Sequence, residues 1–392
     1  MKFFAALFTL PLAALAAPIL EPRDGSSAVP GQFIVVLKPN STQDQLQSSV
    51  ESAGGILGGD FKPKFTYTLG SFMGYHVSAS DDCIKSIANL TEVAYVEPDA
   101  TVSINALVTQ TNAPWGLARI SSRVPGTTDY RYDSSAGADT YAYIIDTGIY
   151  LEHKDFEGRA TFGASFVDGD ASETDGNGHG THVAGTTGSK TYGVAKKTNL
   201  IAVKVLDSEG SGQLSQVIAG MQWAVDDMTN KGRVGKAVGN MSLGASRLVS
   251  QSVNEAAAAA VRAGLFLSVA AGNDGADASL TSPASEPSVC TVAATDKTDR
   301  RASFSNFGNL VDVFAPGVDI LSTWNDGQTN TISGTSMATP HVTGLGAYLL
   351  ALEGPRDPIA LCERIQELAT AGVVKNSLTP NNLLAFNGAT TA

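Results

Sequence analysis

The chain has 392 residues, of which 43% are hydrophobic and 16% charged, a composition that suits a compact globular protein and excludes a disordered chain. Its length exceeds that of one average domain, so two or more folded units are expected. The formal net charge of −12 argues against nucleic acid as a partner, because phosphate binding requires basic surface.

A secretion signal is predicted at residues 1–16. Lys2 supplies a positive charge, the stretch from Phe3 to Ala16 is apolar, and residues 14–16 have the small-x-small pattern of a signal-peptidase site. The apolar run is shorter than the roughly 20 residues that cross a bilayer, and no later segment is long and uninterrupted enough. We therefore expect a secreted, extracellular protein with no membrane partner.

The early part of the chain, residues 33–105, is predicted to be a small unit with the order β-α-β-β-α-β. We place strands at 33–37, 74–78 and 93–97, and helices at 42–53 and from a cap at Asp81 to Leu90. Residues 101–105 follow as an extended segment with no partner in their own unit.

From about residue 139, apolar strands alternate with long helices, as in a parallel sheet covered on both faces. The ligand site of such a fold is expected at the carboxyl ends of the strands. Strands are predicted at 141–145, 200–205, 237–243, 265–270 and 289–293, and helices at 180–188, 213–230, 249–263 and 336–352.

Three segments place a reactive side chain at a strand end or a helix start. Asp146 ends an apolar strand, where a carboxylate has no use in packing. His179 opens a glycine-rich helix; its His-x-x-His spacing with His182 could suggest a metal pair, but no Glu stands at a ligand or base position. Ser336 stands at the start of an apolar helix, where a serine could simply be the N-cap. A cap alone would not require the glycine and small residues that surround it. Pro340 is expected in the first turn of this helix, where proline is tolerated.

In the chain order Asp146, His179, Ser336, these segments closely resemble the motifs of the subtilase family, whose triad order is already known. An α/β-hydrolase would instead show the order Ser, Asp, His and a Gly-x-Ser-x-Gly elbow, which is absent. Residues 110–121 resemble the mature start of the proteinase K and fungal alkaline protease branch, and residues 33–105 resemble the inhibitory propeptide of that family.

The resemblance implies an α/β, three-layer subtilisin-like fold with a mainly parallel sheet between helices, preceded by a small ferredoxin-like α+β propeptide. It divides the chain into a signal peptide (1–16), a propeptide (17–105) and a peptidase domain (106–392), with cleavage after Asn105. The expected partners are protein substrates and the chain's own propeptide, as inhibitor and folding aid. We expect a monomer.

The same resemblance implies a secreted serine endopeptidase of broad specificity that works through an acyl-enzyme and needs no catalytic cofactor. Ser336 is the expected nucleophile, His179 the base and Asp146 its orienting partner. Asn273, at a strand end, is the expected oxyanion-hole side chain. The expected substrate-binding residues are Gly210, Ser211, Gly212, Leu214, Ser242, Leu243 and Gly244.

The three cysteines cannot all pair within one chain, but removal of an early segment containing Cys83 would leave an even pair. The resemblance implies a disulfide between Cys290 and Cys362. It also suggests a structural calcium site made of the carbonyls of Pro287 and Val289 with the carboxylate of Asp312, oxygen ligands that suit a hard cation.

Asn40 and Asn89 stand in glycosylation patterns and would leave with the propeptide. Asn240 has the same pattern but lies in a predicted buried strand, so we expect it to carry no sugar. Two alternatives stay open at this point: a catalytically silent subtilase fold used for binding, and a vacuolar processing protease of the same family.

Overall fold

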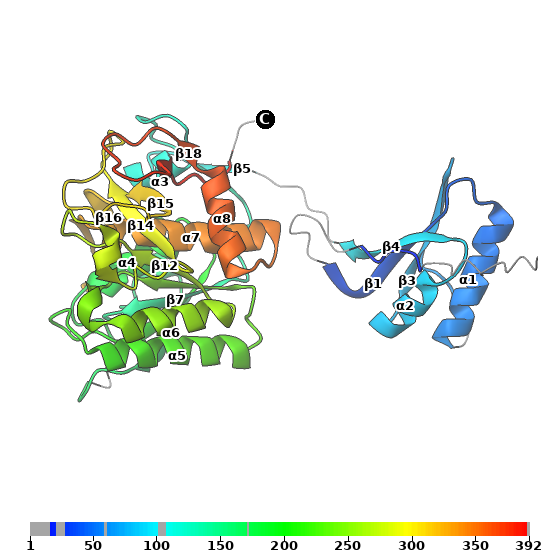
Figure 1. Ribbon diagram of the computed structural model, residues 1–392, viewed down its shortest axis with the longest axis horizontal. Helices are drawn as coiled ribbons and strands as arrows, with labels where there is room; N and C mark the ends of the chain where they lie inside the picture. The colour runs from blue at the N-terminus through cyan, green and yellow to red at the C-terminus, as the bar shows by residue number, and fades with distance from the viewer. Residues whose placement is uncertain (1–15, 21–27, 59–60, 101–106, 171, 390–392) are drawn as a thin grey trace, which may run out of the picture. The chain divides into compact units, whose positions relative to one another are not determined.

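The computed structural model describes residues 16–20, 28–58, 61–100, 107–170 and 172–389 (Figure 1). The chain divides into two compact units between residues 103 and 104, and each is described by itself. The predicted signal peptide up to residue 15, the extended tail 101–105 and the cleavage point after Asn105 lie outside the described residues.

The smaller unit has the predicted element order. Its sheet has the strand order β2-β3-β1-β4, antiparallel throughout, and two helices cover it through Val35, Tyr75, Leu46 and Ile84. One prediction was wrong in detail: Ser80, rather than Asp81, caps the second helix, because its side chain accepts from the N–H of Cys83. The elements are β1 (Ala28–Leu37), α1 (Gln43–Leu57), β2 (Thr66–Leu69), β3 (Phe72–Ser78), α2 (Asp81–Ala88) and β4 (Val93–Ala100).

In the larger unit, nine strands of the described residues form one sheet, in the order β18-β19-β15-β14-β12-β10-β7-β9-β8. All neighbours pair in parallel except the short β18 and β19. The five predicted strands are β7 (Tyr141–Asp146), β9 (Asn199–Lys204), β10 (Ala237–Met241), β12 (Phe266–Ala270) and β14 (Cys290–Thr295). The others are β8 (Ala160–Ser165), β15 (Val313–Pro316), β18 (Thr370–Ala371) and β19 (Leu383–Leu384).

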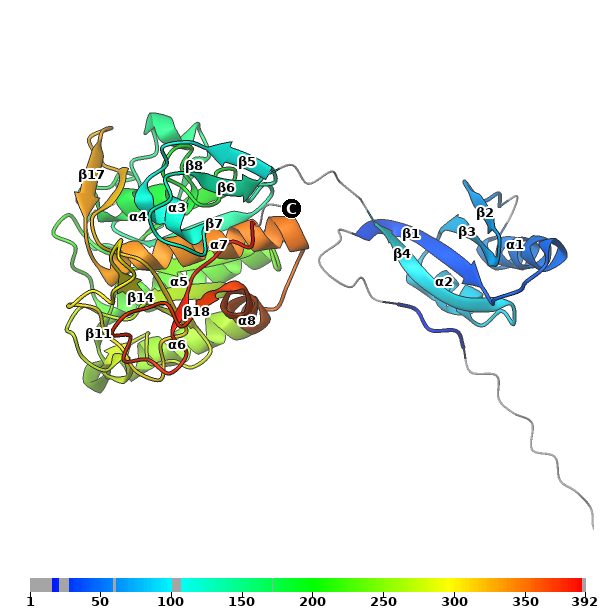
Figure 2. The same ribbon diagram turned by 90° about the horizontal axis from the view of Figure 1, so that it is seen from above.

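Helices cover both faces of this sheet, which confirms the three-layer prediction (Figures 1 and 2). Along β7, Ala142 and Ile144 join the core under α4 and α7, whereas Tyr143 and Ile145 join the core under α5 and α6. This alternation follows from the two-residue period of a strand. The helices are α3 (Trp115–Ile120), α4 (His179–Gly188), α5 (Leu214–Asn230), α6 (Gln251–Arg262), α7 (Thr335–Glu353) and α8 (Pro358–Leu368).

The sheet order places a topological switch point between β7 and β10. From β7 the chain builds β8 and β9 on one side and then crosses to β10 on the other. Connections that leave in opposite directions open a crevice at the carboxyl ends of the two strands. Asp146 ends β7 and Ser242 follows β10, so both stand at this crevice.

Smaller elements and one covalent bond complete the larger unit. The disulfide between Cys290 and Cys362 is present and ties the start of β14 to α8, as predicted. No helix within the described ranges is long and apolar enough to cross a membrane. Paired strands are β5 (Leu107–Gln110) with β6 (Tyr130–Asp133), β11 (Ala245–Ser246) with β13 (Thr281–Ser282), and β16 (Ile320–Thr323) with β17 (Thr329–Ile332); short turns are η1 (Lys154–Phe156), η2 (Arg247–Val249) and η3 (Ala278–Leu280).

Candidate active site

Asp146 and His179 are joined at the switch point. His179 is the first residue of α4, and its Nδ1 lies 2.8 Å from Oδ1 of Asp146, whose side chain is fully buried. The same oxygen accepts from the backbone N–H of Thr147 at 2.7 Å. A carboxylate at Nδ1 holds the ring proton there, which leaves Nε2 as the acceptor of the neutral imidazole.

The surroundings of His179 favour its charged form. Burial lowers the pKa of the imidazolium, but the charge of Asp146, its hydrogen bond and the charge of Asp175 together outweigh burial, so the pKa lies above the usual 6.5. His182, by contrast, turns its Nε2 to the carbonyl of Ile320 at 2.9 Å, and burial lowers its pKa to about 4. The two histidines thus have separate partners and do not form a joint metal pair.

Asp175, which sequence reasoning missed, fixes the geometry beneath this pair. Its buried carboxylate accepts from Thr147 Oγ1 at 2.8 Å on the side of β7, and from Thr181 N at 2.9 Å and Thr181 Oγ1 at 2.6 Å on the side of α4. It also accepts from the N–H groups of Asn177 and Gly178. One carboxylate therefore clamps the loop after Asp146 to the helix start that carries His179.

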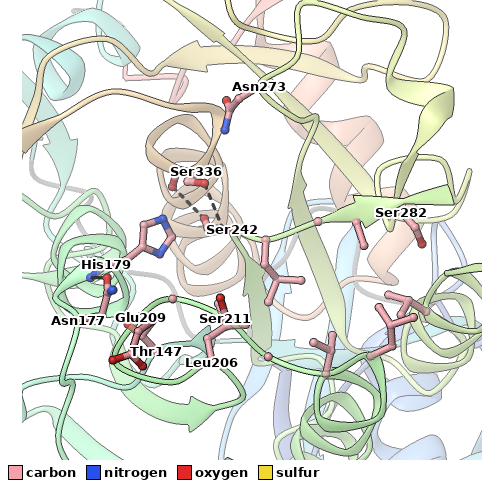
Figure 3. Close-up of a pocket in the computed structure, with 18 residues that line it drawn as sticks. Thr147, Asn177, His179, Leu206, Glu209, Ser211, Ser242, Asn273, Ser282 and Ser336 are labelled. Atoms are coloured by element: carbon pink, nitrogen blue, oxygen red, sulfur yellow. Dashed lines mark hydrogen bonds between the residues drawn. The ribbon is translucent and has the colours of Figure 1, made fainter. Parts of the chain in front are cut away.

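Ser336 lies in the first turn of α7 and lines the same pocket as His179 (Figure 3). Its Oγ donates to the carbonyl of Ser242 at 3.2 Å, and among the described residues it forms no hydrogen bond with His179. Such bonds are often long or absent in proteins without substrate, and rotation about one side-chain bond re-aims the hydroxyl.

Pro340 explains a second link between β10 and α7. The prediction that it falls in the first turn was wrong: α7 begins at Thr335, so a residue at 340 would donate its N–H to the carbonyl of Ser336. Proline has no N–H, and the Oγ of Ser242 donates to that carbonyl instead, at 2.9 Å. The strand end is thereby bonded directly to the residue that carries the hydroxyl.

The amide of Asn273 is oriented by its neighbour Thr335. Its Oδ1 accepts from the N–H and from the Oγ1 of Thr335, both at 2.9 Å, so Nδ2 is the group left to donate. The N–H of Ser336 lies in the first turn of α7, where backbone N–H groups lack intrahelical acceptors. Two donors are thus available in the pocket that Ser336 lines.

Two pockets meet at Ser336. The first has a volume of about 570 Å³, and all seven predicted substrate-binding residues line it. Leu206, Val217 and Val253 add an apolar wall to this pocket, and no local pattern distinguishes these residues in the sequence. The second, of about 560 Å³, lies between Gly244–Ser246 and Ala270–Asn273 and shares Asn273 and Ser336 with the first.

Asp312, which the family resemblance suggested as a calcium ligand, lies beside the start of β14. Its Oδ2 accepts from the N–H of Thr291 at 2.8 Å and its Oδ1 from Gln366 Nε2 at 3.0 Å. Burial raises its pKa to about 6, and it forms no ion pair with a basic side chain in the described part of the chain. A bound cation would supply the positive charge that this carboxylate lacks among the described residues. The sulfurs of Cys290 and Cys362 are also near, but the disulfide removes them as ligands.

The three asparagines in glycosylation patterns differ in exposure. Asn40 and Asn89 are exposed on the smaller unit. Asn240 is fully buried in β10, as its predicted strand required.

Comparisons with known proteins identify the family of the chain. A family model described as "Subtilase family" matches residues 137–377, and one described as "Peptidase inhibitor I9" matches residues 32–105. A cuticle-degrading protease of Metarhizium anisopliae is 49% identical over 95% of this chain and 93% of its own. Alkaline protease 1 of Aspergillus clavatus is 47% identical over 96% of both chains. The crystal structure of a cold-adapted subtilisin-like serine proteinase covers 71% of this chain and all of its own, at 44% identity and a TM-score of 0.67.

Proposed function

The chain belongs to the subtilase family of serine proteases, and we propose that it is a secreted endopeptidase in which Ser336 is the nucleophile, His179 the general base and Asp146 the partner that orients it. The observation that carries this proposal is the 2.8 Å bond between His179 and Asp146 at the switch point, beside the Ser336 hydroxyl.

The proposed reaction begins when Oγ of Ser336 attacks the carbonyl carbon of the scissile peptide and Nε2 of His179 takes its proton. Asp146 stabilises the imidazolium that forms. The negative oxygen of the tetrahedral intermediate accepts hydrogen bonds from Asn273 Nδ2 and the N–H of Ser336. The C–N bond then breaks, His179 returns the proton to the departing amine, and water later releases the acyl group by the same steps. No cofactor is needed.

Substrate recognition is proposed to rest on backbone pairing. Residues 210–212 and 242–244 lie along the first pocket, where an extended substrate can add a strand between them. Because backbone pairing does not depend on side chains, specificity is broad. The apolar wall of Leu206, Leu214 and Val217 favours apolar side chains in the first pocket.

Processing is the second part of the proposal. Residues 1–16 direct secretion, and residues 17–105, which contain the match to Peptidase inhibitor I9, assist folding and inhibit the enzyme until cleavage after Asn105. Sugars at Asn40 and Asn89 would leave with this segment, and the processed enzyme is a monomer. A structural calcium ion held by Asp312 with the carbonyls of Pro287 and Val289 stabilises the fold and takes no part in the reaction.

The test is casein hydrolysis by the protein collected from culture medium, with and without a reagent that modifies active serines, beside the variant Ser336→Ala. The reagent and the variant should each abolish hydrolysis, the variant by ~10⁶-fold in kcat, a loss measured for the corresponding substitution in a subtilisin. Retention of a tenth of the wild-type kcat in the pure variant would refute the assignment. A folded wild-type protein without activity would support the silent-fold alternative, and accumulation in the vacuole would support a processing protease.

A further inference from the structure

An apolar surface cluster lies beside the second pocket. We call it the rim patch and define it as Leu248, Val249 and Leu280, whose exposed fractions are 93%, 71% and 61%. Leu248 and Val249 end the turn η2, and Leu280 ends the turn η3. The strands next to these turns are paired, with Ser246 opposite Thr281, so the two turns lie side by side.

Hydrogen bonds from two buried serines hold the turns that carry the rim patch. Ser250 Oγ donates to the carbonyl of Ser246 at 2.7 Å, and Ser282 Oγ donates to the carbonyl of Ser250 at 2.9 Å. Both Ser250 and Ser282 are buried. The three large apolar side chains are thus exposed to solvent on turns whose backbone is held by these hydrogen bonds. Isolated exposed apolar residues are ordinary, but a contiguous group on a fixed surface marks an interaction site.

The rim patch is continuous with the candidate active site. Leu280 and Ser246 line the second pocket together with Asn273 and Ser336. The rim patch therefore borders the pocket that holds Ser336, within reach of a protein substrate whose scissile bond lies at that residue.

We propose that the rim patch, which borders the second pocket, binds apolar side chains of protein substrates and so directs the enzyme toward apolar and insoluble proteins. This inference rests on the proposed endopeptidase function. A second copy of the chain fits the patch less well, because a stable dimer buries roughly 1,200 Å² or more, which three side chains do not provide.

The experiment compares the processed enzymes of two double variants. Leu248→Ser with Val249→Ser removes the two patch residues that line neither pocket. The matched control is Val234→Ser with Ile359→Ser. These residues are 53% and 48% exposed; Val234 precedes β10 at the end of the sheet opposite the site, and Ile359 lies on α8. Both enzymes are assayed on a blocked tetrapeptide anilide and on fluorescent insoluble elastin.

The patch variant should keep the wild-type kcat/KM on the tetrapeptide to within about twofold and lose about tenfold on elastin, a loss in the range of truncating one or two central contact residues. The control variant should match wild type on both. Equal losses on both substrates, or an unchanged ratio, would overturn the proposal. So would light scattering that shows a wild-type dimer which the patch variant abolishes.

Binding without cleavage separates this inference from the proposed function. In the Ser336→Ala background, the fraction of protein that sediments with elastin should fall with the patch substitutions and stay unchanged with the control. If wild type cleaves no tetrapeptide, the proposed function fails, whereas the patch is still judged by sedimentation. Unchanged sedimentation refutes the patch even if the enzyme is active.

Discussion

Replacing Asp175 by asparagine tests whether this carboxylate positions and tunes His179. The amide oxygen of asparagine can occupy the place of Oδ1, which accepts from Thr147 Oγ1 and from the N–H groups of Asn177 and Gly178. The amide nitrogen then replaces Oδ2 and faces the N–H of Thr181, which loses its acceptor. The Thr181 hydroxyl can turn and accept instead of donating.

The structure thus predicts one buried N–H left unsatisfied, at a cost of about 1–3 kcal/mol in the free energy of unfolding. Because α4 carries His179, a shift of its first turn lowers kcat/KM, by up to ~10²-fold for a displacement near 1 Å. Loss of the charge lowers the pKa of His179, which Asp175 helps to raise. The base must be neutral to act, so the acid limb of the kcat/KM profile moves to lower pH.

The assay is kcat/KM on a blocked tetrapeptide from about pH 5 to about pH 9, on either side of the ordinary histidine pKa, together with thermal melting. Asp155→Asn is the matched control. Asp155 is another buried carboxylate, and it accepts from the N–H and Oγ1 of Thr191, away from His179. The control should lower the melting temperature without moving the acid limb. An acid limb at unchanged or higher pH in Asp175→Asn, or an equal shift in the control, would refute the reasoning.

The wild-type kcat/KM should fall as pH drops through a pKa above 6.5, because the protonated ring cannot accept the Ser336 proton; a flat profile to about pH 4, below the ordinary histidine range, would exclude a histidine base. Excess chelator should lower the melting temperature more than it lowers the initial rate, and Asp312→Ala should have the same effect as the chelator. Equal melting temperatures with excess chelator and with excess calcium would count against the calcium site. Replacing Cys290 and Cys362 by serine should cost about 4 kcal/mol, since the bond closes a loop of 72 residues, and an unchanged urea midpoint would contradict this. Purified residues 17–105 added in trans should inhibit casein hydrolysis competitively, and deletion of 101–105 should remove the effect; no inhibition at micromolar concentration would refute it.

The strands and helices that could be predicted from the sequence each have a distinctive pattern within a few neighbouring residues. The strand from Tyr141 is apolar and ends on a carboxylate, and the segments around His179 and Ser336 combine glycine with a reactive side chain at a helix start. Such patterns need only a few neighbouring residues to be recognised. The short strand β8 was missed because its residues 160–165 are mostly half-buried and include glycine, which blurs the alternation.

The features that escaped prediction depend on distant partners. Asp175 stands in a polar loop that looks solvent-exposed in the sequence, and only the fold buries its carboxylate between Thr147 and Thr181. The bond from Ser242 to the carbonyl of Ser336 joins residues 94 apart. Contacts of this kind have no local pattern, so a single sequence cannot reveal them.

The position of α7 has a consequence for the stage of synthesis at which the proposed activity can first appear. This helix carries Ser336 and lies buried in the core, packed against the sheet beside α4. A nascent chain that has already exposed Asp146 and His179 still lacks both the hydroxyl and the helix around which that half of the core packs. Under the proposed function, proteolytic activity can therefore appear only after nearly the whole chain has been synthesised and folded, so a truncated product that ends before Ser336 is inactive.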